Sequence, residues 1–220
     1  MQIEIEVPSN LSEITLSQYT RYLKLVETNK DVENIDRFMS LKMLEIFCNV
    51  PYKESVKLKI TNVNRVIDHL VEILNSQPEL VQTFSIGDTE FGFIPKLDDM
   101  TFGEYIDLDQ FLGNWDDMYK AMAVLYRPIN KRIGRFYNIK EYTGDSYWDA
   151  MKHTPLDAVF GSTVFFYHLG IDLSKLMTNS LLEDQMQETL HKDLAKSGVG
   201  INQFTHSLKE MLDDMKISQQ

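Results

Sequence analysis

The segments LSEITLSQY (residues 11–19) and LDDMTFGEY (residues 97–105) share the pattern L-x-[ED]-[IM]-T-[LF]-[SG]-[QE]-Y. Each segment follows a short run of extended character that ends in a proline, Pro8 or Pro95. A repeat of this kind predicts a chain built from two similar units, each of which buries the apolar face of the other. The repeat explains how the chain is constructed, and it does not by itself point to a reaction.

Both copies of the repeat have the spacing of a capping box, in which a threonine is followed three residues later by Gln or Glu. We predict that Thr15 and Thr101 each cap a helix, with Gln18 and Glu104 completing the boxes. Tyr19 and Tyr105 would then anchor the two helices in the core. A binding signature is the alternative, because a tyrosine offers both apolar area and a hydroxyl group. The capping geometry accounts for every residue of the pattern, so we prefer it.

The first half of the chain has one strand pattern and several helix patterns. Residues 2–7 alternate between polar and apolar, which predicts a strand. Apolar residues at helical spacing predict one helix from about Thr15 and two more over residues 34–49 and 63–74, whereas residues 53–60 are ambiguous.

The second half opens with a hairpin pattern. Residues 83–86 and 89–94 flank Gly87-Asp88, which predicts a two-residue turn. Because a lone hairpin is marginally stable, we expect it to join the strand over residues 2–7 in a three-stranded sheet. Helices are predicted further on, over residues 103–112, 115–126 and 155–169.

The predicted fold is therefore mainly α with a small antiparallel β-sheet, in the α+β class. It is a tandem pseudo-repeat of two helical units, at about 3–78 and 84–176, plus a helical C-terminal tail. We expect residues 1–176 to form a single domain, with an insertion at 127–154 in the second unit. Residues 177–220 are predicted to be an amphipathic helical tail.

Composition narrows the functional classes. The 220 residues carry a formal net charge of −11, which opposes general affinity for nucleic acid or an anionic membrane surface. Cys48 is the single cysteine, so no internal disulfide can form, as suits a reducing compartment. We expect neither a signal peptide nor a membrane span, because the sequence has no continuous apolar stretch of the required length.

Charge is unevenly distributed in the second half. Residues 88–117 contain nine acidic residues against Lys96, a net charge of −8. Asp107 and Asp109 could suggest a divalent-cation site, but the sequence pattern of a calcium-binding loop is missing. A solvated acidic face is the simpler interpretation.

The segment 127–140 has the opposite sign, with five basic residues, no acidic residue and interleaved aromatic side chains. Three interpretations stay open for it: a nucleic-acid contact, a protein interface, or a solvated loop. A protein interface could use the chain's own acidic 88–117 surface or an acidic patch on a neighbouring subunit.

No catalytic, cofactor or metal signature is recognisable in the sequence. The five histidines lack the spacing of a zinc site, and no serine or cysteine lies in a nucleophile motif. We therefore expect a protein that is not an enzyme and that needs no cofactor.

The C-terminal tail has two short apolar stripes separated by Gly198-Val199-Gly200. It could fold back on the core or dock into a groove of another chain. The stripes are Leu182, Met186, Leu190 and Leu194, then Ile201, Phe204, Leu208, Met211 and Met215.

Residues 92–108, together with residues 121–129 and 14–19, resemble segments of small proteins of tailed bacteriophages. The resemblance covers roughly residues 3–175 and leaves the tail outside. Such proteins are grouped with virion structure or assembly genes, and no catalytic residues come with them. The resemblance implies a protein of phage assembly that is made in the host bacterial cytoplasm and could enter the virion.

We therefore predict a non-enzymatic protein-binding component or chaperone of phage tail or neck assembly. Its expected partners are other phage structural proteins or further copies of itself, with no membrane contact. The alternatives are a phage nucleic-acid-binding or regulatory protein that uses the basic 127–140 segment, and an enzyme of unrecognised type. The predicted interface residues are Arg127, Lys131, Arg132, Arg135, Phe136, Leu182, Met186, Leu190, Phe204 and Leu208.

Overall fold

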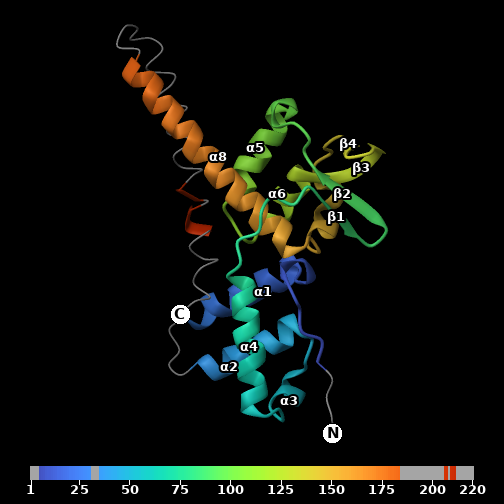
Figure 1. Ribbon diagram of the computed structural model, residues 1–220, viewed down its shortest axis with the longest axis vertical. Helices are drawn as coiled ribbons and strands as arrows, with labels where there is room; N and C mark the ends of the chain where they lie inside the picture. The colour runs from blue at the N-terminus through green and yellow to red at the C-terminus, as the bar shows by residue number, and fades with distance from the viewer. Residues whose placement is uncertain (1–4, 31–34, 184–205, 208, 212–220) are drawn as a thin grey trace.

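The computed structural model describes residues 5–30, 35–183, 206–207 and 209–211, and it has the predicted α+β character. In Figure 1 a group of helices fills the lower part of the view, and a small sheet with further helices lies above it. The lower helices are α1 (Leu16–Asn29), α2 (Asp36–Phe47), α3 (Tyr52–Ser55) and α4 (Ile60–Leu74). The upper helices are α5 (Phe102–Phe111), α6 (Met118–Leu125), α7 (Trp148–Met151) and α8 (Leu156–Glu183).

Both copies of the repeated motif fold in the same local way, and both predicted capping boxes are confirmed. Short 3₁₀ helices, η1 (Leu11–Glu13) and η2 (Leu97–Asp99), precede the caps. The backbone N–H of Thr15 donates to Gln18 Oε1 at 2.9 Å, and that of Thr101 donates to Glu104 Oε2 at 2.6 Å. In return, each threonine Oγ1 accepts from the backbone N–H three residues later. The motif is therefore a helix start in both places.

The Gln or Glu that closes each capping box also contacts a neighbouring element. Gln18 Nε2 donates to the Ile46 carbonyl of α2 at 2.8 Å. Glu104 Oε1 instead lies 2.6 Å from the Arg127 guanidinium. The amide and the carboxylate thus connect two similar helix starts to different parts of the chain.

The two tyrosines of the motif have different environments. Tyr19 is 1% exposed and makes edge-to-face contacts with Trp115 and Phe160. Tyr105 is 53% exposed, so the prediction that it anchors the core is wrong. Helical spacing places Tyr105 beside Phe102 and Ile106 on the outer face of α5, whereas Leu108 points inward.

The sheet has four antiparallel strands in the order β1-β2-β3-β4. The predicted hairpin is confirmed, because Ile86 pairs with Thr89 around the Gly87-Asp88 turn. Residues 5–7 form no strand, so the predicted three-stranded sheet that includes them is wrong. The strands are β1 (Thr83–Ile86), β2 (Thr89–Phe93), β3 (Tyr126–Ile133) and β4 (Phe136–Ile139).

The segment predicted as an insertion supplies β3 and β4, followed by η3 (Asp145–Tyr147) and α7. Arg127 of β3 pairs with Gly92 of β2, and the Tyr137 ring lies over that glycine. A Cβ atom on Gly92 would come within 2.4 Å of Tyr137 Cε2. Tyr137 also donates its hydroxyl hydrogen to the Phe93 carbonyl at 2.9 Å, which fastens the β3–β4 hairpin to β2.

Helix α8 connects the two halves of the chain. Its start is held by main-chain bonds, in which Leu156 N–H donates to the Ile14 carbonyl at 2.8 Å and Leu16 N–H donates to the Thr154 carbonyl at 2.9 Å. Buried side chains from both halves form one hydrophobic cluster. The helix continues to Glu183, past the predicted boundary at residues 176–177, and residues 171–183 contain no Gly or Pro that would interrupt it.

A short part of the C-terminal tail is described, and it contacts the rest of the chain. Ser207 lies against Gly113, where an added Cβ would be 2.9 Å from the serine Cβ. Met211 is 2% exposed.

Candidate functional site

The β3–β4 hairpin places two large apolar side chains in solvent. Ile133 and Phe136 face each other across a two-residue turn and are 67% and 70% exposed. The turn residue Gly134 has φ +61°, a left-handed conformation that glycine adopts without strain. We call residues 131–136 the hairpin tip.

Arg127 lies at the opposite, buried end of β3. Its guanidinium Nη1 is 2.6 Å from Glu104 Oε1, and the two side chains are 9% and 4% exposed. Arg127 therefore does not belong to the exposed predicted interface. The count of charges along the sequence did not reveal that Arg127 is buried, because its partner Glu104 is a capping residue on another element.

Arg132 is half-exposed and also meets an acidic residue of its own chain. Its Nη2 donates to Glu90 Oε1 at 2.6 Å, and its guanidinium lies 5.6 Å from the centre of the Tyr137 ring. Burial raises the pKa of the Tyr137 hydroxyl above its usual value, so this ring stays neutral beside the cation. Two of the five basic residues thus pair with the acidic 88–117 segment, one of the alternatives that the sequence left open.

The remaining three cations of the basic segment, Lys131, Arg135 and Lys140, are exposed and form no ion pair within the described part of the chain. The Arg135 guanidinium lies 5.3 Å from the centre of the Phe136 ring. The hairpin tip therefore combines two exposed apolar side chains with unpaired positive charge.

Five of the predicted interface residues belong to the C-terminal part of the chain. Leu182 lies on α8. Met186, Leu190, Phe204 and Leu208 lie outside the described residues.

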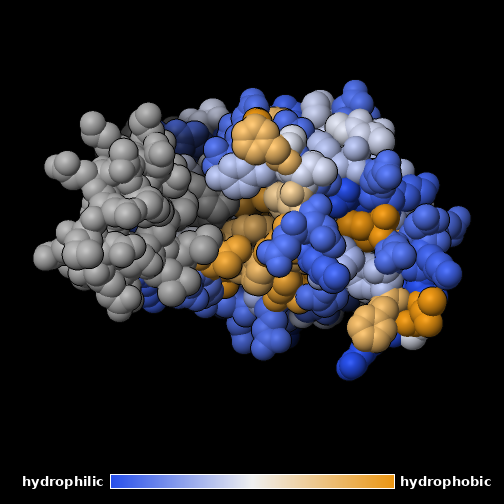
Figure 2. All heavy atoms as spheres, turned by 90° about the horizontal axis from the view of Figure 1, so that it is seen from above, coloured by the Kyte–Doolittle hydropathy of each residue, from blue (hydrophilic) through white to orange (hydrophobic). Residues whose placement is uncertain are grey.

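A second exposed apolar surface, the α5 face, was missed by sequence reasoning. Phe102, Tyr105 and Ile106 are 78%, 53% and 45% exposed and share one side of the helix. Their spacing is also that of a stripe that faces the core, so the sequence pattern alone does not distinguish a buried helix face from an exposed one. Figure 2 looks from above Figure 1 and shows hydrophobic side chains in several groups among hydrophilic ones.

Exposed carboxylates surround the α5 face. Asp98 and Asp99 lie in η2 just before the helix, and Asp109 lies one turn beyond Tyr105. Asp107 accepts a hydrogen bond of 2.8 Å from the Tyr142 hydroxyl, and among the described residues it does not join Asp109 in a group that could hold a metal ion. Burial and this bond raise the pKa of Tyr142 above its usual value.

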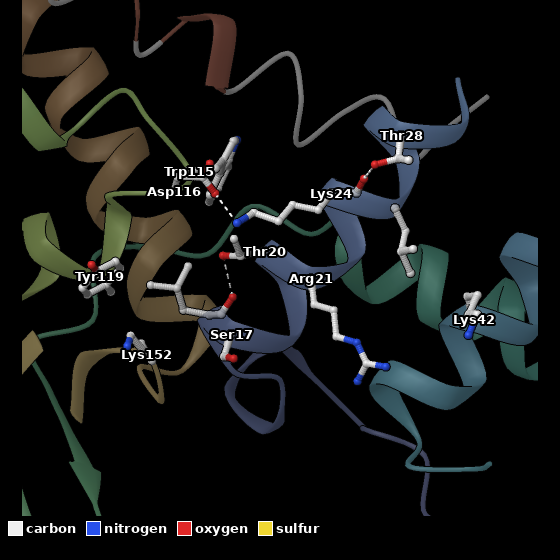
Figure 3. Close-up of a pocket in the computed structure, with 12 residues that line it drawn as sticks. Ser17, Thr20, Arg21, Lys24, Thr28, Lys42, Trp115, Asp116, Tyr119 and Lys152 are labelled. Carbon is white, nitrogen blue, oxygen red and sulfur yellow. Dashed lines mark hydrogen bonds and ion pairs between the residues drawn. The ribbon is translucent and has the colours of Figure 1, made fainter. Parts of the chain in front are cut away.

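A cleft of about 480 Å³ lies between α1 and the residues that join α5 to α6 (Figure 3). All its lining cations contact carboxylates, as Figure 3 shows for Lys24 and Asp116. An anionic ligand would therefore have to displace a carboxylate. The pairs are Arg21–Glu45 at 3.4 Å, Lys24–Asp116 at 2.7 Å, Lys42–Glu45 at 2.6 Å and Lys152–Asp149 at 2.7 Å.

A metal-ligand cluster and a membrane-spanning helix are not found among the residues that the structure describes. Their His, Cys, Asp and Glu side chains nowhere gather in a group that could hold a metal ion. Within the same residues, we find no helix with the length and apolar character to cross a membrane. Comparison with protein-family models, curated proteins and solved structures gives no match.

Proposed function

We propose that the chain is a non-enzymatic protein-binding component of tailed-phage assembly, either a tail or neck part or a chaperone for one. The observation that carries the proposal is the hairpin tip, where Ile133 and Phe136 are both about two-thirds exposed or more. Solvent contact with two adjacent large apolar side chains is unfavourable, and a partner that covers them gains the hydrophobic free energy.

The composition and stiffness of the hairpin tip suit a protein contact. Aromatic and arginine side chains are the types that most often dominate binding energy at interfaces, and Phe136 and Arg135 provide one of each. The hairpin is held to the sheet by the Tyr137 hydroxyl, so little conformational entropy is lost when the tip binds.

The partner class in this proposal comes from the sequence resemblance to phage proteins. Residues 92–108 and 121–129, which carry much of that resemblance, form the end of β2, η2, most of α5, the second part of α6 and the beginning of β3. The protein would be made in the host bacterial cytoplasm and would meet phage structural proteins there.

The tandem pseudo-repeat belongs to the same proposal. The shared sequence of 3₁₀ helix, threonine cap and helix at residues 11–19 and 97–105 supports two related units. The burial of Met211 supports a tail that folds back on the core.

The proposal is tested by affinity capture from phage-infected cells, with mass spectrometry to identify the captured proteins. We expect the tagged chain to retain a phage structural protein, and the pair Ile133→Ser and Phe136→Ser to lose it. The matched control is Val56→Ser with Ile60→Ser, because these side chains are 51% and 64% exposed at a different place. Equal capture by both double variants would refute the role of the tip.

A mobility-shift assay at low salt separates the nucleic-acid alternative. The proposal expects no shift of DNA or RNA by the purified chain. A shift that Arg135→Glu abolishes would support the alternative instead.

A further inference from the structure

We infer that the hairpin tip of one copy docks on the α5 face of a second copy, so that the protein assembles head to tail. This inference rests on the proposed function of the tip as a protein-binding surface, and it names a second copy as the partner. It is carried by two exposed apolar surfaces of opposite charge on one chain.

Internal ion pairs leave the two surfaces with opposite charge. Glu90, Glu104, Asp116 and Asp117 are all paired with basic residues of the same chain. Among described residues without such pairs, Asp98, Asp99 and Asp109 surround the α5 face, with Lys96 close by. The hairpin tip has Lys131 and Arg135 and no acidic residue.

Apolar chemistry also matches between the two surfaces. The tip offers Ile133 and Phe136, and the α5 face offers Phe102, Tyr105 and Ile106. An aromatic pair that stacks or meets edge to face would be buried between them. The unpaired cations and carboxylates would form a polar rim around this apolar centre, the arrangement usual in protein interfaces.

The two surfaces are separate on the molecule. All five apolar side chains keep at least 45% of their area exposed, so the tip of a copy does not cover its own α5 face. Figure 1 shows α5 and the β3–β4 hairpin on different sides of the upper part. Each docked copy therefore keeps one free tip or one free face, and assembly continues into a ring or an open chain.

The test uses the full chain, with light scattering and sedimentation velocity over a series of protein concentrations. The tip variant is Arg135→Glu with Phe136→Ser, and the face variant is Phe102→Ser with Asp109→Lys. We expect the unmodified chain to form assemblies larger than a dimer. Each variant alone should associate with an affinity that is lower by about tenfold or more. Added salt should weaken the association of the unmodified chain, because it screens the polar rim.

Mixing the two variants provides the decisive measurement. The tip variant keeps an intact α5 face and the face variant keeps an intact tip, so the mixture should form a one-to-one pair and stop there. Thermal unfolding of each variant checks that it is folded, and the Val56→Ser, Ile60→Ser control should assemble like the unmodified chain.

Three results would overturn the inference: a monomer at every concentration, unchanged assembly of either variant, or no pairing in the mixture. If the unmodified chain is monomeric but its tip still captures another phage protein, self-assembly is wrong and the proposed function stands. If the tip variants change neither capture nor assembly, both are wrong.

Discussion

Replacing Glu104 with glutamine tests the energetic role of the buried ion pair between α5 and β3. The variant keeps the shape of the side chain, and a glutamine already closes the capping box at Gln18 in the first copy of the motif. What changes is the group that faces Arg127, whose guanidinium would meet an amide in place of a carboxylate. The side chains at this contact are 9% and 4% exposed, so water cannot replace the lost interaction with the guanidinium of Arg127.

The expected loss in the free energy of unfolding follows from this burial. Removing one partner of a buried ion pair costs about 3–5 kcal/mol. That loss is a large part of the roughly 5–15 kcal/mol that stabilises a typical domain. For a chain of this length it should lower the melting temperature by roughly 6–20 °C.

Glu90→Gln is the matched control. The Glu90–Arg132 contact has the same 2.6 Å length, but its side chains are 41% and 40% exposed. An exposed pair contributes about 0–1 kcal/mol, so this variant should unfold almost like the unmodified chain.

The assay is urea unfolding followed by circular dichroism, with calorimetry for the melting temperature. Adding Arg127→Met to Glu104→Gln should recover most of the loss, because the uncompensated cation is then removed. A Glu104→Gln loss no larger than that of Glu90→Gln would refute the reasoning, as would a double variant less stable than the single one.

Three further predictions concern single positions. Thr15→Ala and Thr101→Ala should each lower the free energy of unfolding by about 1 kcal/mol in urea titrations, because each removes a helix cap. Gly161→Ala should lower it by about 1–3 kcal/mol through overpacking, since its Cβ would lie 2.4 Å from the Glu79 carbonyl oxygen. Gly103→Ala, with no atom within 4 Å of its Cβ, should instead raise it by roughly 0.5–1 kcal/mol. Burial raises the pKa of Cys48 to about 11, so a thiol reagent at pH 8 should modify it slowly in the folded chain and rapidly in denaturant.

These three predictions are refuted by specific outcomes. An unchanged urea midpoint for either threonine variant would contradict the capping assignment. Destabilisation of equal size by both glycine variants would show a general cost of alanine, and not a close contact at Gly161. Equally fast modification of Cys48 in folded and unfolded protein would contradict its burial.

Local features of the fold could be predicted from the sequence because they depend on a few adjacent residues. The threonine caps, the Gly87-Asp88 turn and the main helices are set by backbone hydrogen bonds within one or two turns. Their predicted positions agree with the structure to within a few residues, except for α8, which was predicted to end near residue 169 and runs to Glu183.

Features that depend on distant partners could not be predicted in the same way. The alternation of residues 2–7 indicates two faces, but it does not say whether another strand is available to pair with residues 5–7. The basic segment 127–140 was not predicted to contain the strands β3 and β4. These strands depend on pairing with β2 and on the hydrogen bond of Tyr137 to Phe93. Periodicity likewise places Tyr105 on an apolar stripe, but it does not say whether this stripe faces the core or, as in the described part of the chain, remains exposed.

The candidate site was predicted in part. The tip residues Lys131, Arg135 and Phe136 are exposed, whereas Arg127 is buried and Arg132 is paired with Glu90. Charge counted along the chain cannot distinguish a cation that meets a carboxylate across the fold from one that remains in solvent.

The difference between Gln18 and Glu104 has a consequence for any duplicated or shuffled form of this chain. A glutamine in both places would set an amide donor against a guanidinium, and a glutamate in both places would set a carboxylate against the Ile46 carbonyl. The two halves are therefore not exchangeable despite their common pattern. The terminal NH₂ of Gln18 and the carboxylate oxygen of Glu104 each suit the neighbour of their own half. Each group is therefore unfavourable in the other position.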